Sequence, residues 1–174
     1  MNTPNKLTLL RVLLVPVFMV FMLYDFVPYA NFIGAVIFVL ASLTDWLDGH
    51  LARKHNLVTN FGKIMDPLAD KMLVTAALLC LTASGVASPW ISVIILAREF
   101  IVSGVRIAAA AEGNVIAASW WGKIKTVWQM ISLILALVFG GNLLVTICLW
   151  IAALLTVVSG IDYLVKNAKY LSMK

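Results

Sequence analysis

The sequence is dominated by six apolar runs, each long enough to cross a bilayer as a helix. They cover residues 7–24, 31–51, 63–84, 88–109, 120–139 and 143–165. A hydrocarbon core about 30 Å thick needs about 20 helical residues, and turn formers such as Pro28 and Gly140-Gly141 separate the runs. The sequence therefore predicts an all-α, polytopic integral membrane protein with six transmembrane helices, built as one membrane domain over residues 1–174.

The amino-acid composition agrees with lipid as the main solvent of this chain. Hydrophobic residues make up 63% of it and charged residues only 12%. A soluble domain is about 45–50% apolar and about 25% charged, so this chain could not cover its surface with polar groups in water. The net charge of +5 would suit nucleic acid in a soluble protein, but the basic residues lie at the ends of apolar runs. We therefore expect a lipid bilayer around the chain and no nucleic-acid partner.

The placement of the basic residues predicts the orientation in the membrane. Those that fall in the tails and the two longer loops are Lys6, Arg11, Arg53, Lys54, Lys63, Lys123, Lys125, Lys166, Lys169 and Lys174. The three opposite loops contain none, so the positive-inside rule predicts cytoplasmic N- and C-termini. The first run resembles a signal peptide, but Pro28-Tyr29-Ala30 is a poor cleavage site, and we expect a retained helix.

Four aspartates lie where an apolar helix should not have them. Asp45 and Asp48 are spaced i, i+3 at the end of the second run, and Asp66 and Asp70 are spaced i, i+4 at the start of the third. Each pair lies on one helix face, and the short connection between the runs can bring the two faces together. A charge deep in a membrane helix costs about 2.5–3.5 kcal/mol, which indicates a functional role.

Four converging carboxylates require protonation or cations, and an all-oxygen ligand set favours Mg²⁺ or Mn²⁺ over Zn²⁺. Two such ions form the clamp used for displacement at phosphorus. Gly49 and Gly62 permit close backbone approach, Ala52 is small, and Arg53 offers a charge to a phosphate. The alternative, solvated helix-end carboxylates paired with nearby Lys and Arg, explains one or two aspartates but not Asp70, a full turn deeper.

Residues 45–70 form one string, Asp45-x2-Asp48-Gly49-x2-Ala52-Arg53-x8-Gly62-x3-Asp66-x3-Asp70. It resembles the signature of the CDP-alcohol phosphotransferase family at all eight fixed positions. The resemblance implies a six-helix membrane fold, usually a homodimer. In such a protein a nucleotide-activated donor passes a phosphoryl-linked group to an acceptor hydroxyl, and CMP leaves.

Further matches outside the signature cover nearly the whole chain. They are Pro4-Asn5-x-Leu7-Thr8-x-x-Arg11, Thr44-Asp45-Trp46, Asp66-Pro67-x-Ala69-Asp70-Lys71, Ala97-Arg98-Glu99-Phe100 with Ser103 and Arg106, and Gly122-Lys123-x-Lys125-Thr126 with Gln129-Met130. They are similar to the bacterial branch that moves a phosphatidyl group from CDP-diacylglycerol to glycerol-3-phosphate. The resemblance implies a multi-pass protein of the bacterial cytoplasmic membrane with its active site facing the cytoplasm. Another acceptor, as in cardiolipin-, serine- or inositol-type synthases, is the enzymatic alternative.

The resemblance also implies roles for the aspartates. It makes Asp45, Asp48 and Asp66 ligands of two divalent metal ions, Mg²⁺ or Mn²⁺. Asp70 would contribute to the second metal and act as the general base. A base needs hydrogen-bond reach to the attacking hydroxyl, and the deepest carboxylate suits that task.

The remaining candidates bind the two substrates. Those expected to hold CDP-diacylglycerol are Gly49, Ala52, Arg53, Gly62, Thr8 and Arg11. For Thr8 and Arg11 an amphipathic interfacial anchor is an equal alternative. The acceptor carries a phosphate of its own, for which Arg106, Lys123 and Lys125 are candidates, with snorkelling interfacial cations as the alternative. Arg98 lies deeper, and we expect it to pair with Glu99 or other carboxylates.

A small ion-coupled transporter is the non-enzymatic alternative, because intramembrane aspartates also form ion paths. Two features oppose it. The carboxylates cluster at one membrane face, and no inverted repeat or pair of broken helices is evident in the sequence.

Overall fold

The structure is a computed structural model that describes residues 3–24, 28–54, 60–114, 116–117 and 119–170; within them the side chains of residues 3, 4, 45–54, 60–64, 66, 67 and 169 lie outside the description. The described part is all helical, as predicted. Its elements are α1 (Thr3–Leu23), α2 (Ala30–Lys54), α3 (Asn60–Ala83), α4 (Pro89–Ala111), α5 (Trp120–Phe139), α6 (Leu143–Lys166) and the short 3-10 helix η1 (Ala168–Tyr170). The six α-helices follow the six apolar runs closely.

Local sequence signals mark several helix ends. Pro89 begins α4, where the missing amide hydrogen costs nothing. The Ser119 hydroxyl accepts a hydrogen bond from the Gly122 amide at 3.1 Å at the start of α5. Asn142 caps α6 in the same way through the Val145 amide at 2.9 Å. Gly140 ends α5 at a φ of 65°, which a residue with a side chain rarely adopts. These signals fix where consecutive helices turn back on each other.

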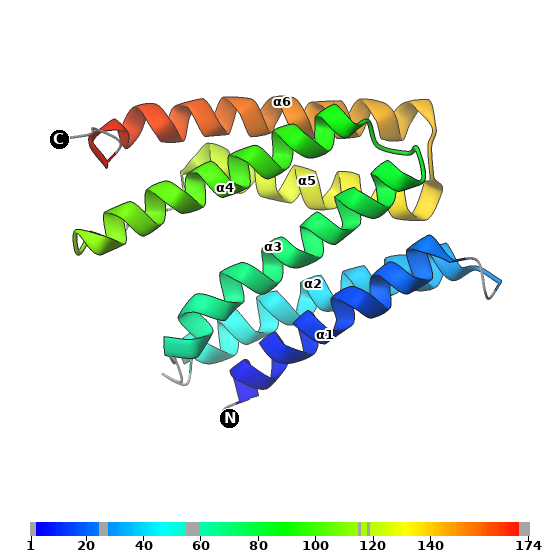
Figure 1. Ribbon diagram of the computed structural model, residues 1–174, viewed down its shortest axis with the longest axis horizontal. Helices are drawn as coiled ribbons and strands as arrows, with labels where there is room; N and C mark the ends of the chain where they lie inside the picture. The colour runs from blue at the N-terminus through cyan, green and yellow to red at the C-terminus, as the bar shows by residue number, and fades with distance from the viewer. Residues whose placement is uncertain (1–2, 25–27, 55–59, 115, 118, 171–174) are drawn as a thin grey trace.

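The helices form two groups that meet along a shared core (Figure 1). Helix α1 packs against α2 and α3, and α6 packs against α4 and α5. Contacts of α2 and α3 with α5, and of α3 with α4, join the groups. Figure 1 shows both chain termini at the same end as the α2–α3 and α4–α5 connections. An even number of antiparallel helices requires this arrangement.

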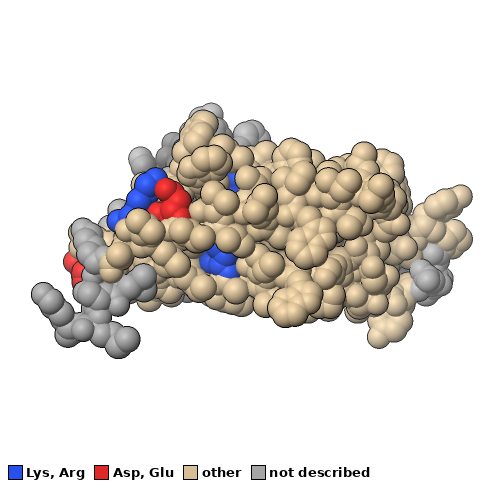
Figure 2. Space-filling view, turned by 90° about the horizontal axis from the view of Figure 1, so that it is seen from above, with Lys and Arg blue, Asp and Glu red and all other residues tan. Residues whose placement is uncertain are grey.

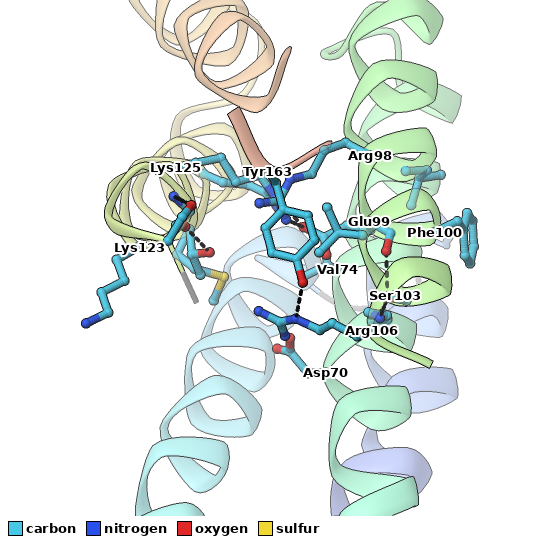
Figure 3. Close-up of a pocket in the computed structure, with 18 of the residues that line it drawn as sticks. Asp70, Val74, Arg98, Glu99, Phe100, Ser103, Arg106, Lys123, Lys125 and Tyr163 are labelled. Atoms are coloured by element: carbon cyan, nitrogen blue, oxygen red, sulfur yellow. Dashed lines mark hydrogen bonds and ion pairs between the residues drawn. The ribbon is translucent and has the colours of Figure 1, made fainter. Parts of the chain in front are cut away.

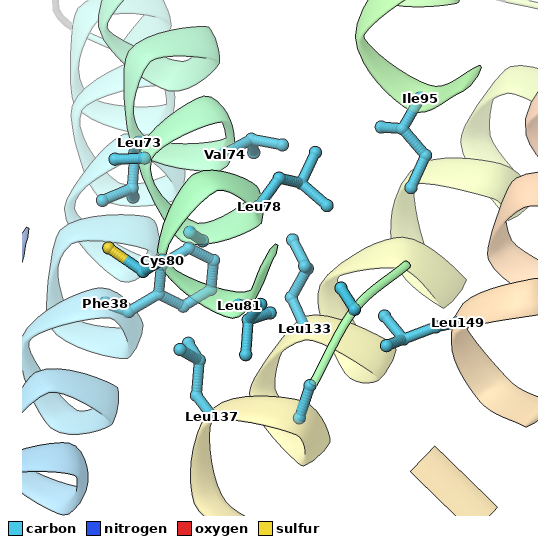
Figure 4. Packing of buried hydrophobic residues seen from close by; sticks show 14 of the residues in the cluster. Phe38, Leu73, Val74, Leu78, Cys80, Leu81, Ile95, Leu133, Leu137 and Leu149 are labelled. Carbon is cyan, nitrogen blue, oxygen red and sulfur yellow. The ribbon is translucent and has the colours of Figure 1, made fainter. Parts of the chain in front are cut away.

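Buried apolar side chains fill the space where the groups meet. Phe38 from α2, Leu78 from α3, Ile95 from α4 and Leu133 from α5 are all fully buried there (Figure 4). The outer surface is also apolar, with large exposed side chains such as Leu143 at 77%. An apolar exterior of this extent is typical of a lipid-facing surface.

Three of the described helical segments are long and apolar enough to cross a membrane, namely Asn5–Leu23, Trp120–Phe139 and Leu143–Lys166. The described apolar part of α2 is shorter, Ala30–Thr44. Helix α4 has the length but carries Arg98, Glu99 and Arg106 among its apolar residues. These three charged residues set α4 apart from a plain spanning helix.

Candidate active site

A cavity of about 480 Å³ opens between α3, α4, α5 and α6. Its polar lining residues include Asp70, Lys71, Arg98, Glu99, Ser103, Arg106, Ser119, Lys123, Lys125, Thr126, Gln129 and Tyr163. On the face shown in Figure 2, the charged side chains gather in the half of the molecule that carries the termini in Figure 1. The cavity thus unites most of the described candidates from the sequence.

Helix α3 contributes Asp70 and Lys71. The Asp70 side chain is exposed at the cavity and lies within electrostatic range of Lys125 across it. Lys71 donates a hydrogen bond to the Ser103 hydroxyl on α4, and Ser103 in turn donates to the Glu99 carbonyl at 2.6 Å. This chain of bonds ties α3 to α4 directly beside Asp70.

Glu99 joins the cations of two helices. Its carboxylate forms an ion pair with Lys125 of α5 and lies 3.6 Å from an Nη atom of Arg98. The expected pairing of Arg98 with Glu99 is confirmed. Lys125 lies inside α5 and is only 1% exposed, so the loop position expected for it from the sequence is wrong. Burial of an ammonium group is costly without a partner, and Glu99 supplies one.

Arg98 lies against glycines of the two neighbouring helices α5 and α6. A Cβ atom on Gly160 of α6 would lie 3.1 Å from Arg98 Cγ, and one on Gly122 of α5 would lie 3.4 Å from an Arg98 Nη atom. The glycine at 160 therefore gives the arginine room that a side chain would take, whereas the distance at Gly122 is an ordinary van der Waals contact. Packing around Arg98 fixes its position more firmly than a surface arginine allows.

Arg106 and Lys123 are both exposed, but they differ in orientation. The Arg106 Nε atom donates to the Tyr163 hydroxyl at 3.4 Å, and its guanidinium lies 5.8 Å from the centre of that ring. Figure 3 shows Arg106 and Asp70 on the same side of the pocket. Lys123 points away from the labelled cations in Figure 3, and its amine lies 5.9 Å from the centre of the Trp120 ring. Of the two, Arg106 is oriented toward the cavity.

The four aspartates lie on two helices that pack against each other. Asp45 and Asp48 belong to α2, and Asp66 and Asp70 to α3, so their helical spacing is as predicted. The side chains of Asp45, Asp48 and Asp66 lie outside the described residues, and no group of three metal-ligating side chains occurs among those described. Among the described residues, Asp70 brings a carboxylate to the cavity, a ligand type that suits a divalent cation such as Mg²⁺ or Mn²⁺.

Only some of the residues expected to bind the donor substrate are described. Four of them lie outside the described side chains, namely Gly49, Ala52, Arg53 and Gly62. Thr8 and Arg11 are described and fully buried, and Arg11 Nε donates to the Ala41 carbonyl of α2 at 3.3 Å. An interfacial anchor exposes its polar side chains, so that alternative is wrong for these two residues.

Several polar cavity residues were not predicted to take part in the site, among them Ser103, Gln129 and Tyr163. These three line the cavity beside the predicted cations. Gln129 follows Lys125 by four residues, and Ser103 follows Glu99 by four, so each shares a helix face with a charged candidate. That spacing of polar residues within apolar helices was the signal available in the sequence.

Comparison with known proteins confirms the family that the signature resembles. The CDP-alcohol phosphatidyltransferase family model matches residues 1–158. The chain therefore belongs to this family. It is 46% identical to the CDP-diacylglycerol–glycerol-3-phosphate 3-phosphatidyltransferase of Bacillus subtilis, with 95% of each chain covered. Proteins of the same name in Rickettsia bellii and Haemophilus influenzae are 42% and 43% identical, covering 97% and 94% of this chain and 97% and 91% of their own.

Proposed function

We propose that this protein transfers the phosphatidyl group of CDP-diacylglycerol to glycerol-3-phosphate, giving phosphatidylglycerophosphate and CMP. The observation that carries the proposal is the charge of the cavity beside Asp70. Five cationic side chains and two carboxylates line it, which leaves an excess of positive charge for a phosphorylated acceptor. The names of the relatives agree with this choice of donor and acceptor.

The reaction takes place at a membrane surface, where the lipid donor resides. We propose six spans, cytoplasmic termini and a cytoplasmic active site in a bacterial cell membrane, with the chain acting as a homodimer. The three apolar helices and the common end of both termini support this topology. The charged residues of α4 face the cavity rather than lipid, which removes the main objection to α4 as a span.

Asp45, Asp48, Asp66 and Asp70 would hold the two divalent ions. When bound, Mg²⁺ or Mn²⁺ supplies neutralisation of the diphosphate and stabilisation of the CMP leaving group. The carboxylates need partners of opposite charge, because four such groups repel one another at close range. The family resemblance gives Asp70 its place in this set.

Asp70 also serves as the general base. Its carboxylate takes the proton from the attacking hydroxyl of glycerol-3-phosphate while the hydroxyl oxygen forms a bond to the phosphorus next to diacylglycerol. The bond from that phosphorus to the CMP oxygen breaks. Exposure of Asp70 at the cavity gives an acceptor access to this carboxylate.

The donor would be held by the signature residues and by α1. We assign the cytidine diphosphate to Gly49, Ala52, Arg53 and Gly62. Thr8 and Arg11 support this part of the site from α1. Arg11 is bonded to the Ala41 carbonyl, one helical turn before Asp45, so it can fix the end of α2 that carries the signature.

The acceptor phosphate would be held by Arg106, Lys125 and Lys123, in unequal degree. Arg106 presents a planar guanidinium suited to phosphate, and Tyr163 orients it. Lys125 is held in place by Glu99, so its amine does not have to be ordered when the phosphate binds. Lys123 acts at the rim through its charge, because its amine lies over Trp120.

The test is CMP release by the purified protein with CDP-diacylglycerol, Mg²⁺ or Mn²⁺, and a panel of acceptors. The panel consists of glycerol-3-phosphate, phosphatidylglycerol, serine and inositol. Glycerol-3-phosphate should give the highest kcat/KM, since it alone brings a small dianionic phosphate to the cationic cavity. A preference for serine or inositol would overturn the proposal.

A further inference from the structure

Gln129 is a buried polar residue in the wall of the cavity. It lies on α5 one turn beyond Lys125, about 6 Å further along the helix axis, and its side chain is only 3% exposed. Its Oε1 atom has no hydrogen-bond partner among the described residues. Buried side-chain oxygens are nearly always hydrogen-bonded, so a bare one in a cavity wall indicates a missing partner.

A second unsatisfied atom lies in the same cavity. The Nε atom of Arg98 is also buried without a partner in the described part of the chain, although an Nη atom of the same group lies near Glu99. Arg98 can donate and Gln129 Oε1 can only accept. The cavity wall therefore offers a hydrogen-bond donor and a hydrogen-bond acceptor that no described residue uses.

Because Gln129 Oε1 can only accept hydrogen bonds, it limits which ligands can bind beside it. A carbonyl oxygen is repelled by a phosphate, which has only acceptor oxygens at neutral pH, so Gln129 Oε1 requires a ligand with an O–H or N–H group. Glycerol-3-phosphate carries two hydroxyls. The primary hydroxyl is the less hindered nucleophile, which leaves the secondary hydroxyl as a donor.

We infer that Gln129 accepts a hydrogen bond from the non-reacting hydroxyl of the acceptor, and so selects a phosphorylated diol over a phosphorylated mono-alcohol. The inference rests on the proposed function and adds a specificity-determining residue to it. A site built to bond a substrate hydroxyl rejects an analogue that lacks it, because the buried oxygen is then left unpaired.

The experiment compares glycerol-3-phosphate with 3-hydroxypropyl phosphate, which keeps the primary hydroxyl and the phosphate but lacks the secondary hydroxyl. The native protein should prefer glycerol-3-phosphate by about tenfold or more in kcat/KM. Gln129→Met keeps the length of the side chain and removes the amide. It should lower kcat/KM for glycerol-3-phosphate by about tenfold and change kcat/KM for the analogue by less than about twofold. The KM for CDP-diacylglycerol should stay unchanged.

Ser132→Ala is the matched control. Ser132 is a fully buried polar residue of α5 whose hydroxyl bonds to the Trp128 and Cys148 carbonyls and which does not line the cavity. This variant should keep the native preference between the two acceptors.

Three results would overturn the inference. They are equal use of both acceptors by the native protein, an equal loss for both in Gln129→Met, and a changed KM for CDP-diacylglycerol in that variant. The first needs no variant and so holds even if Gln129→Met does not fold. Failure of the proposed function gives a different result, namely no CMP release by the native protein with either phosphorylated acceptor while another alcohol is used.

Discussion

Helices α3, α4 and α5 contribute to both the apolar core and the charged cavity. Helix α3 places Asp70 at the cavity and Leu78 in the core, two turns further along. Helix α5 does the same with Lys125 and Leu133. In α4, which runs the opposite way, Ile95 in the core precedes the charged residues. Each helix is thus divided along its length into a charged part and an apolar part.

The difference between the two regions lies in what each depends on. In the core, buried apolar area and close packing stabilise the fold, and the apolar side chains there need no hydrogen-bond partner. In the cavity, Glu99 balances Lys125 within an excess of cations, and two buried polar atoms of the described lining residues have no hydrogen-bond partner. Substitutions in the core should therefore lower stability, and substitutions in the cavity should lower catalytic activity.

The largest effect should come from removal of divalent metal. Treatment with a chelator should abolish CMP release, because the carboxylate set depends on cations for its charge balance. Addition of Mg²⁺ or Mn²⁺ in excess should restore it. Thermal unfolding in detergent should change little, since the core does not include the aspartates. Turnover that persists after exhaustive chelation would show that the aspartates do not act through a metal.

Asp70→Asn should lower kcat by about 10³-fold, because the variant lacks the base and a charged oxygen ligand. CMP release measures this loss. Asp162→Asn is the control, since Asp162 forms an i, i+4 ion pair with Lys166 outside the cavity. Native turnover in Asp70→Asn would refute the assignment of the base.

Leu133→Ala tests the other region. Leu133 is fully buried in the core, and loss of a buried leucine side chain costs about 2–5 kcal/mol of unfolding free energy. The variant should unfold at a lower temperature or denaturant concentration, while the kcat of its folded fraction stays near native. Leu154→Ala, at a leucine that is 63% exposed, is the matched control and should have little effect. A selective loss of kcat in Leu133→Ala would mean that the regions are coupled.

Lys125→Met and Arg106→Ala distinguish a buried cation that has an ion-pair partner from an exposed cation of the cavity. Both should raise the KM for glycerol-3-phosphate about tenfold and leave that for CDP-diacylglycerol unchanged, since each loses a charge-assisted bond to phosphate. Only Lys125→Met should also lower stability, by about 1–3 kcal/mol, because it leaves Glu99 without its main partner. Equal losses for both substrates would show that the residue is structural.

The sequence was sufficient to predict the helices and the class of chemistry. Apolar runs of about 20 residues predict helices directly, and the spacing of Asp66 and Asp70 predicts a shared helix face that α3 provides. The partner of Lys125 could not be predicted, because Glu99 lies 26 residues away and meets it only through the packing of α4 against its neighbours. Gln129 was missed for a related reason, since an unsatisfied oxygen is a property of the packed cavity and not of any local pattern.

The smallest effect is expected for Lys123→Ala, which tests whether orientation or mere charge decides a role in the cavity. The side chain is exposed and its amine lies over Trp120, so the variant should raise the KM for glycerol-3-phosphate by less than about threefold at physiological salt. Lys166→Ala removes an equal charge outside the cavity and sets the baseline. A tenfold rise in Lys123→Ala would mean that Lys123 swings inward when the acceptor binds. The contacts in the structure would then not identify the cations that hold the phosphate. The ion-paired Lys125 would have no special role among them.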